Sequence, residues 1–290
     1  MSELVIGSRG SKLALWQANH IAAQLTAHGH TTRIEIIQTT GDKITDVALS
    51  KVGTKGVFTK EIEEALLAGT IDLAVHSAKD MPTDLPAGLI LAAFPERQDP
   101  RDALIGEMPD GAVVGTSSLR RAAQLKNIRP DVDIRDIRGN VDTRLRKQAE
   151  GQYSAILLAA AGLIRLGWQD RISEYLDPAV FVPAVGQGAL AIETREDGAK
   201  GHQAAARMDD PETRARLTAE RAALRALGGG CQVPMGAHAI LDAGTIRIHG
   251  IVVSLDGRTA IRAHAEGPAA DAGNVGIELG EKLLRAGARL

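Results

Sequence analysis

Cys231 has the plainest capacity for covalent chemistry in this sequence, because it is the only cysteine among 290 residues. Three glycines precede it at 228–230, and Pro234 follows. Glycine suits the end of a helix and proline prevents the helix from resuming, so we expect the thiol on a tight turn. Such a thiol can serve as an attachment point or a nucleophile. Free cysteine is also among the most buried residue types, so position alone leaves both interpretations open.

A second reactive group follows the apolar run 71–75, where an imidazole, a hydroxyl, an amine and a carboxylate occur together: His76, Ser77, Lys79 and Asp80. Ligands bind at the carboxyl ends of strands in open α/β sheets. Asp80 is the main candidate acid/base, because a carboxylate among cations can stabilise a developing positive charge or carry a proton. The alternative is that Asp80 neutralises Lys79 or caps a turn. His76 could act as a base, but a buried, hydrogen-bonded histidine is the more frequent case.

Several arginines fall at or near the first turn of a predicted helix, where the helix dipole disfavours a cation by about 0.3–1 kcal/mol. They are Arg9, Arg120, Arg121, Arg138 and Arg144, accompanied by the hydroxyls of Ser8, Ser11, Thr116, Ser117 and Ser118. The guanidinium fork matches a carboxylate or a phosphate. Such a recurring set predicts an anionic ligand with several acidic groups. The alternative is that each arginine pairs with a nearby Asp or Glu on the surface.

Composition and missing motifs exclude several classes of function. Thirty-four Lys and Arg against 36 Asp and Glu give a net charge of −2, which argues against a general nucleic-acid or membrane-surface binder. One cysteine allows neither an intramolecular disulfide nor a CxxC metal site, and no HExxH is present, so we expect no metal. Nucleotide motifs GxGxxG and GxxxxGK[ST] are absent. Without an apolar run of about 18 residues or a leader, the sequence predicts a cytoplasmic protein that does not bind membranes.

Strands alternating with helices must position these side chains. Apolar runs predict strands at 4–6, 33–37, 71–75, 113–114, 134–137 and 155–159. Helical spacing predicts helices at 12–25 and 59–68, and three more helices follow later strands: one ends at about 127, one ends at 151 and one bears Arg165. The alternation predicts mostly parallel sheets. Residues 39–57 form a long loop, which is typically functional or disordered. Aromatic residues are 2% of the chain, so the cores must be aliphatic.

The last part of the chain has a different pattern. Two strands are predicted at 245–254 and 258–265, joined at Asp256-Gly257, and a helix follows at 274–285. This indicates a small α+β domain with an antiparallel sheet. The Gly- and Pro-containing stretch 182–192 fits a crossing between domains and ends in a strand at 189–192.

Six stretches together resemble the porphobilinogen deaminase family, also called hydroxymethylbilane synthases. They are residues 6–17, 76–82, 114–121, 138–141, 183–189 and 229–234, in order along most of the chain. The resemblance implies a monomeric transferase of porphyrin biosynthesis. It implies that four porphobilinogen molecules are joined head to tail, with loss of ammonia, into a linear tetrapyrrole.

The resemblance also implies a three-domain α/β fold. Residues 1–95 with 189–206 would form domain 1, residues 96–188 domain 2, and residues 207–290 domain 3. Domains 1 and 2 would resemble the halves of a periplasmic binding protein, with mixed, mostly parallel sheets and the active site in the cleft between them. Domain 3 would be the small α+β domain that carries Cys231.

Roles for individual residues follow from the same resemblance. Cys231 would carry a dipyrromethane cofactor through a thioether, and Asp80 would be the catalytic aspartate. Residues implied to hold cofactor or substrate carboxylates are Arg9, Ser11, Ser77, Lys79, Thr116, Ser117, Arg120, Arg121, Arg138, Arg144, Arg165 and Gln187. Residues 39–57, with Lys51 and Lys55, would form a loop over the site, and Phe58 would follow it as a substrate contact.

Two other classes of protein remain as alternatives. A binding protein of the periplasmic type would grip a multivalent carboxylate without chemistry and would need no cysteine on a turn. A thiol-dependent hydrolase would use Cys231 as its nucleophile, but no histidine lies in a convincing partner motif.

Overall fold

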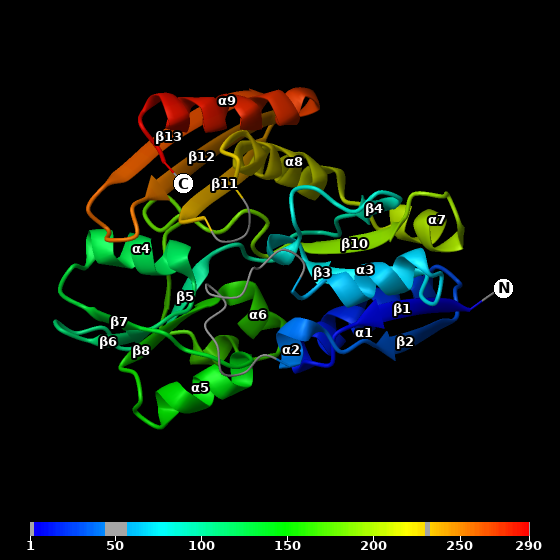
Figure 1. Ribbon diagram of the computed structural model, residues 1–290, viewed down its shortest axis with the longest axis horizontal. Helices are drawn as coiled ribbons and strands as arrows, with labels where there is room; N and C mark the ends of the chain where they lie inside the picture. The colour runs from blue at the N-terminus through cyan, green and yellow to red at the C-terminus, as the bar shows by residue number, and fades with distance from the viewer. Residues whose placement is uncertain (1–2, 44–56, 230–232, 290) are drawn as a thin grey trace. The chain divides into compact units, whose positions relative to one another are not determined.

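The computed structural model describes residues 3–43, 57–229 and 233–289 (Figure 1). The chain divides into two compact units. The first contains Met1–Arg97 and Ala189–Arg214, and the second contains Gln98–Gly188 and Ala215–Leu290.

The first unit is built on a five-stranded sheet with the order β2-β1-β3-β10-β4. Its strands are β1 (Leu4–Ser8), β2 (Thr32–Ile36), β3 (Leu73–Ser77), β4 (Leu89–Ala93) and β10 (Leu190–Arg195). Its helices are α1 (Lys12–Ala27), α2 (Thr40–Lys43), α3 (Lys60–Leu67) and α7 (Lys200–Ala206), with a 3-10 turn, η2, at Ala78–Asp80. α8 (Pro211–Ala226) begins in this unit and continues into the second.

Aliphatic side chains cover both faces of this sheet. Helices α1 and α7 pack on one face, where Ile21 and Leu25 are fully buried. Helix α3 packs on the other face through Ile62 and Leu66. Each such side chain contributes about 1.5–3 kcal/mol when it leaves water. This packing holds fixed the strand ends that carry the polar residues.

The second unit contains a five-stranded sheet with the order β7-β6-β8-β5-β9. Its strands are β5 (Asp102–Gly106), β6 (Val113–Gly115), β7 (Asp133–Arg135), β8 (Ala155–Ala159) and β9 (Glu174–Tyr175). Around it are α4 (Leu119–Ile128), α5 (Val141–Ala149), α6 (Ala160–Arg165) and the 3-10 turn η3 (Gln169–Arg171). Separate aliphatic clusters, one with Leu104 and Leu125 and one with Ile105 and Leu163, fill its two faces.

The two sheets share one pattern. In each, one strand runs antiparallel to both of its neighbours: β10 against β3 and β4, and β5 against β8 and β9. The other pairs, such as β1 with β2 and β6 with β7, are parallel. This confirms the prediction of mixed, mostly parallel sheets.

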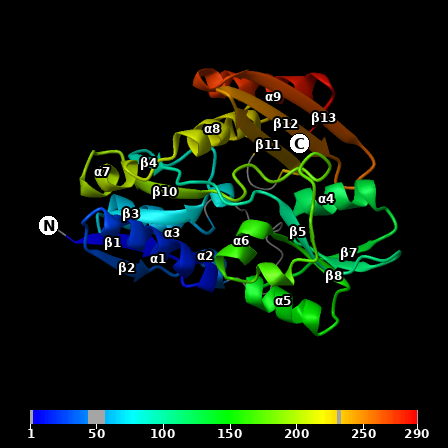
Figure 2. The ribbon, with the colours of Figure 1, turned by 180° about the vertical axis from the view of Figure 1, so that it is seen from behind.

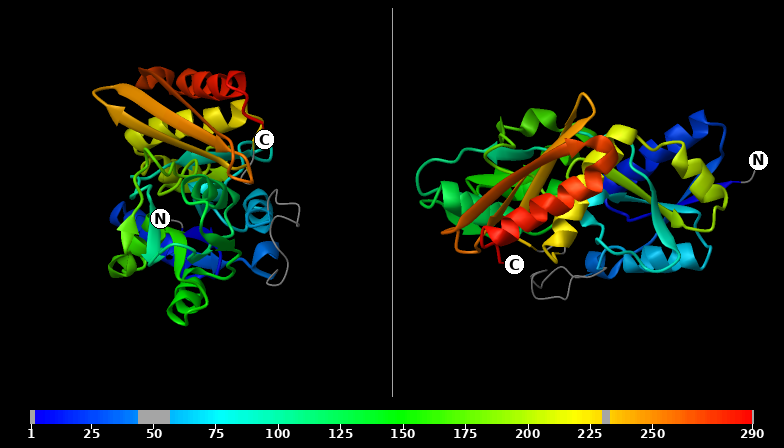
Figure 3. Two further views of the ribbon diagram at one scale, coloured as in Figure 1. Left: turned by 90° about the vertical axis from the view of Figure 1, so that its left-hand side faces the viewer. Right: turned by 90° about the horizontal axis from the view of Figure 1, so that it is seen from above.

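The second unit also holds a three-stranded antiparallel sheet, which confirms the prediction for the end of the chain. Its strands are β11 (Met235–Asp242), β12 (Thr245–Val253) and β13 (Ala260–Pro268). After the 3-10 turn η4 (Ala269–Asp271), α9 (Ala272–Arg285) packs with α8 over the apolar face of this sheet (Figures 2 and 3).

Glycines set the distance between α8 and α9. A Cβ at Gly276 would lie 2.1 Å from the carbonyl oxygen of Ala219, and one at Gly280 would lie 2.6 Å from the Cβ of Ala226. These two positions allow the helix backbones to approach closely.

Several sequence predictions need correction. The predicted strand 71–75 lies at Leu73–Ser77, so Ser77 ends the strand instead of following it. β11 was not predicted, because Met235–Asp242 starts beside a proline and lacks β-branched residues at its beginning. Residues 39–57 include a short helix, α2, where a loop was expected. Lys51, Lys55 and Cys231 lie outside the described residues, and the three-domain division stays a prediction.

Candidate active site

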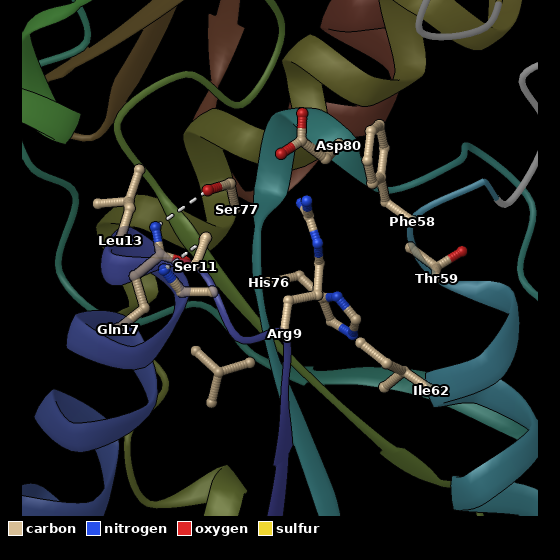
Figure 4. A pocket seen from close by; sticks show the side chains of 12 residues that line it. Arg9, Ser11, Leu13, Gln17, Phe58, Thr59, Ile62, His76, Ser77 and Asp80 are labelled. Atoms are coloured by element: carbon tan, nitrogen blue, oxygen red, sulfur yellow. Dashed lines mark hydrogen bonds between the residues drawn. The ribbon is translucent and has the colours of Figure 1, made fainter. Parts of the chain in front are cut away.

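One pocket of the first unit gathers several of the predicted site residues (Figure 4). It is lined by Arg9, Ser11, Leu13, Ala14, Gln17, Phe58, Thr59, Ile62, Val75, His76, Ser77 and Asp80. These residues come from the β1–α1 loop and the start of α1, from the residues that lead into α3 and its first turn, and from the end of β3 with η2. The pocket therefore lies at the carboxyl ends of two parallel neighbours, β1 and β3.

Local hydrogen bonds explain the shape of these strand ends. Ser11 caps α1, because its Oγ accepts a hydrogen bond from the backbone N–H of Ala14 at 3.2 Å. The Oγ of Ser77 accepts a hydrogen bond from the Nε2 of Gln17 at 3.0 Å, which ties α1 to the end of β3. Asp80 ends η2 and is exposed. Among the described residues its carboxylate has no hydrogen-bond or ion-pair partner, so it is available to a ligand.

The guanidinium of Arg9 is held on two sides. The carboxylate of Asp42 accepts hydrogen bonds from Arg9 Nε, at 3.1 Å to Oδ1, and from Arg9 Nη2. The Phe58 ring lies 4.3 Å from the guanidinium carbon in a cation–π contact. Burial raises the pKa of Asp42, but hydrogen bonds from Arg9 and Thr39 outweigh it and leave the pKa below its usual value. Arg9 thus has a charged partner within the protein, and Asp42 was not predicted from the sequence.

A buried ion-pair cluster lies in the second unit around Asp102, whose side chain is fully buried. Asp102 Oδ2 accepts from Arg120 Nη1 at 2.7 Å, and Oδ1 accepts from Arg121 Nε at 2.7 Å and from Gln187 Nε2 at 3.0 Å. Burial raises the pKa of Asp102, but the positive charges of Arg120 and Arg121 outweigh it and hold the pKa far below its usual range. The first turn of α4 therefore carries two arginines that an internal carboxylate offsets.

The second unit contains three further arginines that the sequence predicted as site residues, Arg138, Arg144 and Arg165. Arg144 Nε donates to the carbonyl of Gly139 at 2.7 Å. Burial, then the nearby positive charges of Arg121 and Arg138, lower the pKa of Arg144 to about 10. Arg165 Nη2 donates to the carbonyl of Gly188 at 2.7 Å, and burial lowers the pKa of Arg165 to about 10. Arg138 pairs with Asp136 at 3.6 Å.

The predicted hydroxyls before α4 make local bonds. Ser117 Oγ donates to the carbonyl of Ile137, and Thr116 Oγ1 accepts from the backbone N–H of Ser118 at 3.2 Å. Ser118 is the residue that caps α4, because its Oγ accepts from the backbone N–H of Arg121 at 3.4 Å. These bonds shape the loop that follows β6.

The structure thus divides the predicted site residues between the two units. Arg9, Ser11, Phe58, Ser77 and Asp80 line one pocket, and Lys79 lies between two of them in the chain without lining it. The second unit holds the others that the structure describes: Thr116, Ser117, Arg120, Arg121, Arg138, Arg144, Arg165 and Gln187. For Arg9, Arg120, Arg121 and Arg138 the alternative of pairing with a protein carboxylate is present, and for Arg120 and Arg121 that pair is buried instead of solvated. Their roles toward a ligand stay predictions.

Comparison with known proteins decides the family. The family model described as "Porphobilinogen deaminase, dipyromethane cofactor binding domain" matches residues 4–203, and "Porphobilinogen deaminase, C-terminal domain" matches residues 215–285. The chain belongs to the porphobilinogen deaminase family. The porphobilinogen deaminase of Syntrophobacter fumaroxidans is 52% identical over 98% of this chain and 95% of its own length. That of Roseiflexus castenholzii is 51% identical over 99% of this chain and 97% of its own.

Among solved structures, a periplasmic substrate-binding protein of an ABC transporter from Coxiella burnetii is 12% identical, with a TM-score of 0.42. The aligned region covers 71% of this chain and 91% of the Coxiella protein. A TM-score this low supports no argument about this chain. Within the described part of the deaminase-family chain, no cluster of three or more His, Cys, Asp or Glu side chains is placed to hold a metal ion. The described helices include none long and apolar enough to span a membrane.

Proposed function

We propose that this protein joins four porphobilinogen molecules head to tail, with loss of ammonia, into the linear tetrapyrrole hydroxymethylbilane. The observation that carries the proposal is the match to both deaminase-family models, which together extend from residue 4 to residue 285. The pocket at the ends of β1 and β3 supports it, because an exposed carboxylate and an arginine line the same pocket.

The side chains present fit a dipyrromethane group, which bears acetate and propionate carboxylates. Arg144 lies close enough to Arg121 and Arg138 for their charges to depress its pKa, so carboxylates brought there would relieve cation–cation repulsion. Arg120 Nε is buried and has no hydrogen-bond partner among the described residues. When bound through Cys231, the cofactor supplies the primer to which pyrrole units are added.

We assign Asp80 the role of catalytic aspartate in this reaction. The C–N bond of the aminomethyl group breaks while its nitrogen is protonated, and the electron pair of that bond leaves with ammonia. The substrate is then a pyrrolic cation. A carboxylate in the pocket stabilises this cation by its negative charge and by accepting a hydrogen bond from the pyrrole N–H. After the new C–C bond forms, the α-carbon loses its proton and the ring regains its aromatic electrons. Asp80 would accept that proton in a pocket whose lining arginine, Arg9, is already paired with Asp42.

The remaining polar side chains bind and orient carboxylates. Arg9 and Ser11 would hold the groups of the incoming porphobilinogen at the start of α1, with Phe58 against the ring. Lys79, Thr116, Ser117, Arg138, Arg144 and Arg165 would hold the carboxylates of the cofactor and the growing chain, as would Arg120, Arg121 and Gln187. Lys51 and Lys55 would act from the loop at 39–57.

We further propose a monomeric enzyme of the cytoplasm, organised in three domains, that acts on porphobilinogen and binds neither nucleic acid nor membranes. A net charge of −2 supports the last two points. Sedimentation of the purified protein as a 30.6 kDa species would agree with the monomer, and a concentration-dependent dimer would contradict it.

Intact-mass measurement with an activity assay tests the proposed function. We expect the active protein to exceed its sequence mass by two pyrrole units and to release ammonia as tetrapyrrole forms. Cys231→Ser should lose both the added mass and the activity. An unmodified, folded protein that binds porphobilinogen without turnover would favour the binding-protein alternative. Thiol-dependent hydrolysis without tetrapyrrole formation would favour the hydrolase.

A further inference from the structure

Behind the pocket lies a buried cluster of acidic and basic side chains that the proposed reaction has not yet used. His76 on β3 lines the pocket, and its Nε2 lies 3.0 Å from Oε2 of Glu193 on β10. Glu193 is fully buried, and Glu63, on the apolar face of α3, is 8% exposed. Figure 4 shows His76 beside Ile62 on the α3 side of Arg9.

Three oxygen atoms in this cluster are buried without a normal hydrogen bond among the described residues. They are Oε1 of Glu193, Oε1 of Glu63 and Oγ1 of Thr59. Thr59 precedes α3 but its hydroxyl does not cap the helix. Thr59 still interacts with Glu63, because its side chain lowers the pKa of that carboxyl. The two glutamate oxygens are buried without a normal partner, and buried polar atoms are nearly always bonded, which indicates a proton that the two carboxylates share.

The charges of the cluster favour uptake of a proton. Burial raises the pKa of Glu63, and the negative charges of Glu193 and Glu64 raise it further, whereas Thr59 and His76 partly offset the rise. β1 and β4, which also pack against α3, carry no titratable side chains. β10 also carries Arg195, whose Nη1 donates to the carbonyl of Leu66 on α3 at 2.6 Å, and the pocket side contributes Arg9 and Asp80. Glu63 is therefore a stronger proton acceptor than an exposed glutamate.

We propose that His76, Glu193 and Glu63 form a proton relay that opens into the pocket through the imidazole and receives the proton released at each condensation. The relay rests on the proposed function. The α C–H bond breaks, its electrons restore the aromatic ring, and Asp80 takes up the proton and passes it to His76, which lines the same pocket. His76 accepts a proton on its pocket side and passes the proton on Nε2 to Glu193. Glu193 and Glu63 then share it until it returns to solvent or to ammonia. Glu193 and Glu63 are positioning residues, because they act through His76.

Glu63→Gln tests the relay, because glutamine keeps the shape of a protonated glutamic acid but accepts no proton. We expect kcat to fall by about tenfold or more, with KM for porphobilinogen changed less than twofold. Wild-type kcat should decrease as the pH drops through the pKa of Glu63. The variant should lack that decrease. Its glutamine imitates a protonated Glu63 at every pH, so its kcat should be low throughout the pH range.

Glu64→Gln is the matched control, since the neighbouring Glu64 is exposed and pairs at the surface with Lys60. It should keep the wild-type kcat at neutral pH, and the fall in its kcat should move to lower pH, because the charge of Glu64 raises the pKa of Glu63. The double variant Glu63→Gln with Glu193→Gln should be no slower than the slower single variant, because members of one relay are not additive.

Folded Glu63→Gln with a wild-type kcat and pH profile would overturn the relay and leave a purely structural cluster.

A second measurement needs no variant. Infrared difference spectra of the wild-type protein during turnover should show a buried carboxyl gaining a proton, and an unchanged carboxyl band would equally overturn the relay. If the wild-type protein formed no tetrapyrrole, the proposed function itself would fail. Normal turnover in both proteins would remove the relay alone.

Discussion

Two aspartates illustrate how position decides what the same side chain does. Asp80 follows β3, is exposed, and lines a pocket. Asp102 begins β5, is fully buried, and accepts hydrogen bonds from two arginines. Asp80 can therefore bind a ligand, whereas the carboxylate of Asp102 is already occupied by hydrogen bonds from Arg120 and Arg121.

Asp80→Asn should lower the rate of ammonia release by roughly 10²–10⁴-fold, because the substitution removes the proposed base and the charge that stabilises a cation. Since Asp80 is exposed, the free energy of unfolding should change by less than about 0.5 kcal/mol. Steady-state kinetics and urea unfolding measure the two effects. Asp84→Asn, four residues later, is the control for loss of a nearby charge. Near-wild-type turnover by folded Asp80→Asn would remove Asp80 from its role.

Asp102→Asn should destabilise the protein by about 3–5 kcal/mol at pH 7, because it leaves two buried guanidinium groups without their charged partner. The pKa of Asp102 in the folded protein lies below that of an unfolded aspartate, about 3.9. Its contribution is thus fully present above that value and is lost as the pH falls toward the folded pKa. Urea unfolding should show a constant difference from wild type between pH 5 and 7 that narrows below pH 4. A difference that widened on acidification would contradict this account.

The sequence predicted Asp80 but not Asp102, for a physical reason. Asp80 belongs to a local pattern, a polar run directly after an apolar strand, and such patterns are visible without the fold. The partners of Asp102 lie 18, 19 and 85 positions away in the chain. A single sequence does not show such distant pairings, and the same holds for Arg9 and Asp42, which are 33 positions apart.

At the scale of elements, the contact between α8 and α9 depends on where side chains are missing. Gly276 and Gly280 lie one turn apart on α9, against the alanines of α8. Both face carbonyl or Cβ atoms that a methyl group would strike, whereas Gly273, nearer the start of α9, has its nearest neighbour 3.9 Å from a built Cβ.

Gly276→Ala should therefore destabilise the protein by about 1–3 kcal/mol through forced separation of the helices. Gly273→Ala, with room for its methyl group, should range from neutral to about 1 kcal/mol more stable, because alanine favours the helix. Thermal and urea unfolding of the two variants compare the effects. Equal stability of the two would show that the close approach does not matter.

Elements with a strong local period were the ones the sequence predicted well. Strand β8 lies where it was predicted, and helix α4 ends within a residue of its predicted end. Helix α7 was missed, since Lys200–Ala206 is short and contains glycine, histidine and glutamine without an apolar period. β5 was missed because it is buried on both faces and starts with an ionised residue, so it shows no alternation.

At the scale of the whole molecule, the chain leaves the first unit and returns to it through paired segments. The backbone N–H of Gln98 donates to the carbonyl of Gly188 at 3.2 Å, and Arg165 donates to the same carbonyl. Gly188 has a φ of +88°, and a Cβ there would lie 2.3 Å from the carbonyl oxygen of Gln98. The pairing thus requires glycine for both conformation and space.

Gly188→Ala should cost more stability than Gly198→Ala, which is its matched control. Gly198 also has a positive φ, +68°, but nothing lies within 4 Å of its built Cβ. We expect about 1–2 kcal/mol for the conformational cost alone at Gly198 and at least about 1–3 kcal/mol more at Gly188, from overpacking. Urea unfolding measures the difference in the free energy of unfolding. Equal losses in the two variants would mean that the segments paired at Gln98 and Gly188 can move apart without destabilising the protein.

Strand alternation predicted the fold class but could not predict the order of the sheets. β10 inserts between β3 and β4, although Ser77 and its partner Leu190 are more than 100 residues apart in the chain. No local signal identifies a central strand that arrives so late. The resemblance to a known family supplied only the expectation that residues 189–206 return to domain 1, and no strand order.

The late arrival of β10 has a consequence for biosynthesis. As the chain emerges from the ribosome, β3 and β4 are complete while the strand that bridges them, Leu190–Arg195, has yet to be translated. At about 5–20 residues per second, the intervening ~100 residues take roughly 5–20 s. Throughout that interval two strand edges stand open to other polypeptides. Chains truncated before Leu190 should therefore aggregate or engage chaperones, whereas release after Arg195 closes the gap.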